Sequence, residues 1–154
     1  MEEFLLRNAK DTDVDLTYIW AANPKIRTFS FNQNEIVFEE HKQWFFKKIK
    51  SKDCYYFLLD KNIETIGSIR FDIKENEAII SYLIDSKYFG SGYGVVLLQK
   101  GIQRLINLND KRISKIVGYV MKNNFPSIKA FEKLNFEKDE IDQNNIKFYK
   151  EILE

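Results

Sequence analysis

The spacing of apolar residues predicts a chain that alternates short strands with helices. Six runs in which apolar residues cluster or alternate predict strands: Glu3–Arg7, Tyr55–Leu59, Glu64–Ile73, Ala78–Asp85, Ile113–Val120 and Asn145–Leu153. Apolar residues at helical spacing predict four helices: one after Asp11–Asp13 that ends at Asn23-Pro24, then Glu35–Lys50, Val95–Leu108 and Asn124–Leu134. The order is β-α-α-β-β-β-α-β-α-β, with an optional further strand near the end. This order predicts one mixed α/β domain over residues 1–154.

Two short turns fix the expected pairing in the middle of the chain. Asp60–Asn62 and Lys74–Asn76 separate three consecutive strands, and turns this short join antiparallel neighbours. Within the second of these strands, Ser68 and Arg70 alternate with apolar residues. We therefore expect Ser68 and Arg70 to share one face of an antiparallel meander.

Composition excludes several classes of protein. The 154 residues carry 24 Lys+Arg against 23 Asp+Glu, so a nucleic-acid partner held mainly by phosphate contacts is not expected. The single Cys54 and single His41 give neither an internal disulfide nor a closed zinc site, and no metal is expected. No signal peptide and no long apolar run is apparent. We expect a cytoplasmic domain, monomeric or homodimeric, without a membrane partner.

Glycines concentrate at one junction between a predicted strand and a predicted helix. Four of the six lie at Gly90, Gly92, Gly94 and Gly101. Glycine lets backbone amides approach a ligand closely, and the following helix N-terminus adds unpaired N–H donors. Together these features predict an anion cradle suited to a pyrophosphate. A Walker loop and a dinucleotide-binding loop are both excluded, because Val95 follows Gly94 and the loop follows an antiparallel meander.

Two segments carry a resemblance to a known family. Ile84–Leu98 resembles the acetyl-CoA loop of the Gcn5-related N-acetyltransferase (GNAT) superfamily, and Asn124–Phe136 resembles its later Asn-to-Phe motif. The resemblance implies the GNAT fold, a mostly antiparallel sheet of about 6–7 strands flanked by about four helices. It also implies direct acetyl transfer from acetyl-CoA to an amine. The implied cofactor contacts are Leu83, Ile84, Asp85, Phe89, Gly90, Ser91, Gly92, Tyr93, Gly94, Val95, Asn124, Ser127 and Phe131.

Two aromatic residues depart from the family pattern. Phe89 stands where the family usually places Gln or Arg beside the pyrophosphate. Phe131 stands where a Tyr commonly acts as general acid toward the departing thiolate, and Phe has no proton to give. That role is empty, moved to another group, or left to water. The change Phe131→Tyr is expected to leave the fold intact.

The acceptor side resembles one branch of the family. Trp20–Arg27, Phe38–His41 and Ile66–Asp72 are similar to segments of N-acetyltransferases that act on amino-sugar nucleotides, as in the pseudaminic-acid pathway. The implied acceptor contacts are Asn23, Arg27, His41, Ser68 and Arg70.

Each of these contacts has a simpler structural interpretation. His41 is the candidate proton acceptor because histidine titrates near neutral pH, but a place in the core competes with that role. Asn23 can cap a helix, Arg27 can be a surface charge, and Arg70 can pair with Asp72.

Three functions remain open. The preferred acceptor is a small amino-sugar nucleotide. The alternatives are another small amine or a protein N-terminus, and a weakly catalytic acyl-CoA-binding sensor.

Overall fold

The computed structural model describes residues 3–31 and 34–152. In this part of the chain the elements are β1 (Phe4–Asn8), α1 (Val14–Ala22), α2 (Pro24–Arg27), α3 (Phe38–Lys50), β2 (Cys54–Lys61), β3 (Glu64–Lys74), β4 (Glu77–Ile84), α4 (Tyr93–Leu108), β5 (Lys115–Met121), α5 (Phe125–Lys133), β6 (Glu137–Glu140) and β7 (Asn145–Glu151). The predicted order and fold class are confirmed. The four-residue α2 was not predicted, and β6 occupies the optional position. The last strand was predicted to reach Leu153, which lies outside the described residues.

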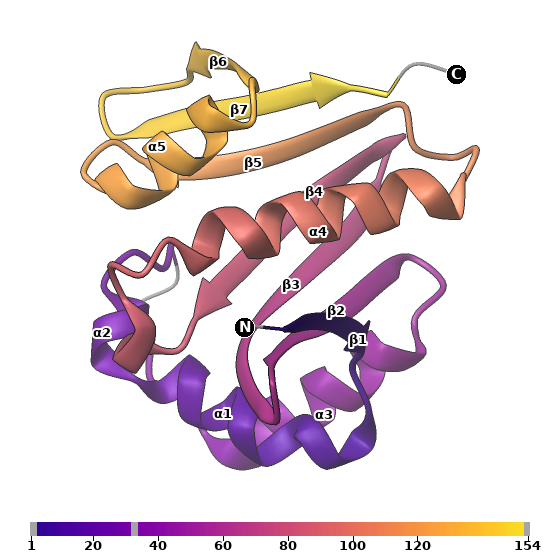
Figure 1. Ribbon diagram of the computed structural model, residues 1–154, viewed down its shortest axis with the longest axis vertical. Coiled ribbons are helices and arrows are strands. Elements are labelled where there is room, and N and C mark those ends of the chain that lie inside the picture. The colour runs from indigo at the N-terminus through magenta and orange to yellow at the C-terminus, as the bar shows by residue number, and fades with distance from the viewer. Residues whose placement is uncertain (1–2, 32–33, 153–154) are drawn as a thin grey trace.

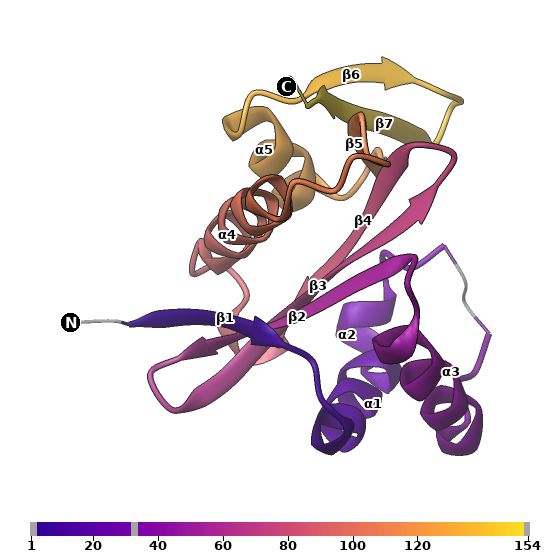
Figure 2. The ribbon, with the colours of Figure 1, turned by 90° about the vertical axis from the view of Figure 1, so that its right-hand side faces the viewer.

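One sheet organises the molecule, with helices on both faces. Its strand order is β1-β2-β3-β4-β5-β7-β6, and every neighbouring pair is antiparallel except β4 with β5. Helices α4 and α5 cover one face, while α1, α2 and α3 lie on the other (Figures 1 and 2). The predicted meander of β2, β3 and β4 is confirmed.

The parallel contact between β4 and β5 is short. Only three residues of β4, from Glu77 to Ile79, pair with β5. Beyond Ile79 the two strands diverge (Figure 1), so no described strand pairs with the β5-facing edge of Ile80–Ile84. Backbone N–H and C=O groups along such an edge need partners from elsewhere. The glycine-rich loop follows directly after this stretch.

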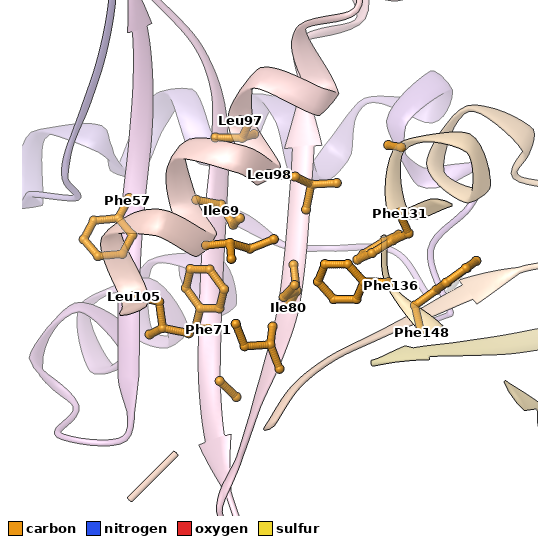
Figure 3. Close-up of a cluster of buried hydrophobic side chains, with 14 of the residues drawn as sticks. Phe57, Ile69, Phe71, Ile80, Leu97, Leu98, Leu105, Phe131, Phe136 and Phe148 are labelled. Carbon is orange, nitrogen blue, oxygen red and sulfur yellow. The ribbon is translucent and has the colours of Figure 1, made fainter. Parts of the chain in front are cut away.

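The apolar core divides between the two halves of the sheet. Under α4, Leu98 and Leu105 lie over Ile69 and Phe71 of β3 (Figure 3). Under α5, three phenylalanines pack together: Phe131, Phe136 and Phe148 (Figure 3). Each helix is thus held by its own half of the sheet.

Phe131 is the central residue of the α5 cluster and is only 1% exposed. Its ring stacks on Phe148 at 5.0 Å and meets Phe136 edge-on at 5.0 Å. A Cβ added to Gly118 of β5 would lie 2.6 Å from Phe131 Cζ. The end of the ring therefore packs directly on the Gly118 backbone, where little room exists for a hydroxyl.

This packing changes the expectation for Phe131→Tyr. The added hydroxyl should overpack the contact with Gly118 and lower the free energy of unfolding by about 1–3 kcal/mol. Urea denaturation measures the loss. Phe125→Tyr is the matched control, because Phe125 lies in the same helix and is 65% exposed. Equal stability of the two variants would contradict this account of Phe131.

Candidate active site

The loop after β4 places two glycines in a conformation that other residues rarely adopt. Gly90 has φ 82° and Gly92 has φ 80°. No heavy atom lies within 4 Å of a Cβ added at either position, so the loop is open on that side. Gly92 is the N-cap of α4, and no side chain caps the helix there. The first-turn amides are thus available to an anion, and this geometry suits a pyrophosphate.

Residues of α1 and the α1–α2 junction anchor the start of this loop. The indole N–H of Trp20 donates to Asp85 Oδ2 at 2.9 Å, and the amide of Lys87 donates to Asp85 Oδ1 at 3.1 Å. Asn23 Nδ2 donates to Ser86 Oγ at 3.0 Å. Asp85 and Asn23, expected as ligand contacts, thus both hold the loop in place. Asn23 also caps α2 through the Lys25 amide, as its simpler interpretation proposed.

The left-handed glycines generate a stability prediction. Gly92→Ala should lower the free energy of unfolding by about 1–2 kcal/mol, because a Cβ disfavours this conformation. Gly94→Ala is the control: its Cβ would meet Tyr82 at an ordinary 3.6 Å, and the residue is helical. Chemical denaturation compares the two. A Gly92 variant as stable as the Gly94 variant would contradict the assigned conformation.

Across the diverging strands, the first turn of α5 reaches β4 through one hydrogen bond. Asn124 Oδ1 accepts from the Ser127 amide at 3.4 Å and so caps α5. Ser127 Oγ lies 2.7 Å from Tyr82 Oη. Phe131 faces the core, whereas Phe89 is 54% exposed at the loop. Tyr82 was not among the predicted site residues, although its place in an alternating strand put it on the α4 side.

His41 lies buried between α1 and α3, with 5% exposure. Its Nε2 is 3.0 Å from Thr17 Oγ1. The Thr17 hydroxyl also lies 2.9 Å from the Asp13 carbonyl, to which it donates, so Nε2 is the donor toward Thr17. Burial lowers the pKa of His41. His41 is therefore a neutral imidazole at pH 7, held in an aromatic setting that includes Tyr18 and Trp44, each 5.6 Å away.

Arg70 is held by an ion pair and by an aromatic ring. Its Nε donates to Asp72 Oδ2 at 2.8 Å, and its guanidinium lies 4.8 Å from the centre of the Trp44 ring. Burial raises the pKa of Asp72, but Arg70 and Lys48 outweigh it and keep that pKa below its usual value. The Asp72 pairing considered from the sequence is thus present. Ser68 lies buried on the same face of β3.

A hollow of about 420 Å³ lies beside α1 and α2, lined by Tyr18, Ala22, Pro24, Arg27, Thr28, Glu35 and Ile36. Arg27 thus lines this hollow. Tyr18 joins it to the His41 cluster, since its ring contacts His41 and its hydroxyl donates to the Ile36 carbonyl at 3.1 Å. The predicted acceptor residues therefore form two neighbouring groups on the α1–α3 side of the sheet. Tyr18, which the sequence did not single out, connects them.

The buried imidazole generates a pH prediction. His41 is the only histidine of the chain, so a single imidazole signal should titrate by NMR with a midpoint below 6.5. As the pH falls through that value the unfolded chain takes up the proton first. The free energy of unfolding should then decrease by up to about 1.4 kcal/mol per pH unit, until folded His41 also protonates.

His41→Gln is the control, because it removes the titration and should flatten this part of the stability curve. A wild-type midpoint at or above 6.5 would refute the assignment of His41 as a desolvated, neutral group.

Comparison with known proteins identifies the family. The model of the acetyltransferase (GNAT) domain matches residues 3–137. The chain belongs to this family and is an acyltransferase domain of the GNAT type, as the sequence resemblance implied.

One curated relative is an uncharacterized protein of Methanocaldococcus jannaschii, 28% identical over 147 residues. The match covers 93% of this chain but 30% of the relative, so the chain spans about a third of that protein's length.

Two solved structures share the fold. Spermidine N-acetyltransferase from Vibrio cholerae, in complex with CoA and spermine, superposes with a TM-score of 0.85, 18% identity, and coverage of 96% of this chain and 95% of that one. Campylobacter jejuni N-acetyltransferase PseH superposes with a TM-score of 0.69, 20% identity, and coverage of 96% and 97%. At these identities the likeness concerns the fold. No helix in the described part of this chain is long and apolar enough to cross a membrane.

Proposed function

We propose that the domain transfers an acetyl group from acetyl-CoA directly to the primary amine of a small molecule. The observation that carries this proposal is the combination of two open backbone features. The edge of β4 from Ile80 to Ile84 has no described strand partner on the β5 side, and it leads into the uncapped N-terminus of α4. A linear donor of peptide-like groups ending in a pyrophosphate would match both.

On the donor side, the amides of residues 90–94 would hold the pyrophosphate, and the lone edge of β4 near Leu83 would hydrogen-bond the pantetheine amides. Acetyl-CoA supplies an activated thioester when bound. The protein aligns that group and excludes water from it.

Direct transfer agrees with the state of the one thiol. Burial and the nearby Asp72 raise the pKa of Cys54 to about 12, so it stays protonated at neutral pH. A protonated thiol is a poor nucleophile, and a covalent acetyl-cysteine is not part of the proposal.

On the acceptor side, we propose an amino-sugar nucleotide that enters from the α1–α3 face. Arg27 in the hollow suits a phosphate, and the half-exposed Trp44 offers a ring on which a sugar or base can pack. His41, or a water near it, would accept the amine proton.

A second acceptor class also has support. Glu35 lines the same hollow as Arg27, and a carboxylate there suits a polyamine. The Vibrio cholerae enzyme with the same fold holds spermine. An acyl-CoA sensor and an enzyme for protein N-termini remain alternatives without an observation of their own.

The test uses thermal unfolding and thiol release. Acetyl-CoA should raise the Tm, by about 2.7 kcal/mol of stabilisation at 100 times Kd. Release of free thiol from acetyl-CoA should then be fastest with amino-sugar nucleotides in a panel that also contains spermidine, aminoglycosides and short peptides. Mass spectrometry should show acetylation of the acceptor nitrogen.

Each other outcome has a definite meaning. Turnover with spermidine alone would replace the preferred acceptor by the polyamine. A raised Tm without turnover on any amine would favour the sensor. No change in Tm with acetyl-CoA would sink the proposed function itself.

A further inference from the structure

Tyr82 occupies a singular place at the lone edge of β4. It is the third residue beyond Ile79, the last residue of β4 that pairs with β5. Its ring meets that of Phe131 edge-on at 6.0 Å, and its Cε2 lies 3.6 Å from a Cβ added at Gly94. Its hydroxyl lies 2.7 Å from Ser127 Oγ. The phenol is thus placed between the first turn of α4 and the first turn of α5.

This position matters because the acid role is otherwise unfilled nearby. Phe131 carries no proton, and its ring end is directed onto Gly118, away from the lone edge. Of the hydroxyls in this contact, a phenol with an ordinary pKa near 10 is far closer than an alcohol to a thiol, near 8.5. Tyr82 is therefore the better donor toward sulfur than Ser127.

The setting of Tyr82 also keeps its proton in place before reaction. Burial raises the pKa of Tyr82, and the hydrogen bond with Ser127 only partly opposes this. The phenol is therefore protonated at neutral pH. A hydrogen-bond donor in a partly dry setting stabilises charge that develops on a leaving atom.

We infer that the Tyr82 hydroxyl donates to the sulfur that leaves the acetyl group, in place of a residue on α5. This inference rests on the proposed function. As the acceptor nitrogen forms its bond to the acetyl carbon and the carbon–sulfur bond breaks, the electron pair of that bond remains on sulfur. Tyr82 gives sulfur its proton. The phenolate then regains a proton, through water, from the nitrogen that has become an amide, so one proton passes from amine to thiol overall.

Ser127 has a different part in this scheme. Its hydroxyl holds the Tyr82 hydroxyl between β4 and α5, and it is a positioning residue. Loss of either hydroxyl removes the same hydrogen bond, but only loss of the Tyr82 hydroxyl removes the donor to sulfur. Tyr82→Phe and Ser127→Ala are therefore a matched pair.

The test measures binding of two probes, CoA and desulfo-CoA, by titration calorimetry without turnover. The wild type should prefer CoA because its sulfur meets Tyr82. Tyr82→Phe should weaken CoA binding about 5–10-fold, the worth of one hydrogen bond, and change desulfo-CoA binding less than about 2-fold. Ser127→Ala should change the binding of both probes in parallel. In turnover, Tyr82→Phe should lower kcat by about 10²–10⁴-fold with little change in the KM for acetyl-CoA.

The outcomes separate this inference from the proposed function. Parallel weakening of both probes by Tyr82→Phe would show a packing role alone and overturn the inference, as would an unchanged kcat. A wild type that binds neither probe would overturn the proposed function, and the inference with it. Thermal unfolding of the free variants is the folding control, and the two should lose stability equally.

Discussion

The parallel pairing of β4 with β5 stops after three residues, and the rest of the candidate site depends on that limit. Helix α4 packs on the β3 side of the divergence, while α5 is fixed to β5 and β7 through Phe131, Gly118 and Phe148. Each half has its own apolar anchor, so the core does not draw the strands together. A stretch of β4 backbone is left available beside a helix N-terminus.

The donor loop and the acceptor wall are mechanically connected. Trp20 is almost fully buried in α1, and its indole holds Asp85 at the point where β4 ends. Asn23 adds a second link to Ser86. Because both links are hydrogen bonds from the α1–α2 region, the position of the acceptor wall is set by the same residues that orient the glycine loop. A rigid relation of this kind is what transfer between two bound substrates requires.

Local patterns in the sequence predicted much of this, and long-range contacts account for most of what they missed. The glycine loop and the Asn124 cap were readable because the physical causes lie within a few residues. The four-residue α2 has too short a pattern to detect. The contacts of Tyr82 with Ser127 and of His41 with Thr17 join residues 45 and 24 positions apart, and no local spacing reveals them. The orientation of Phe131 was missed for the same reason, since it depends on Gly118 in another strand.

Hydrogen exchange with and without CoA tests the central claim most directly. If the lone edge of β4 and the α4 N-terminus together hold the donor, CoA should slow exchange of amides within residues 80–84 and 90–94. The β6 and β7 amides, at the far side of the sheet, should be unchanged. Binding of CoA with no added protection in these two segments would contradict the account.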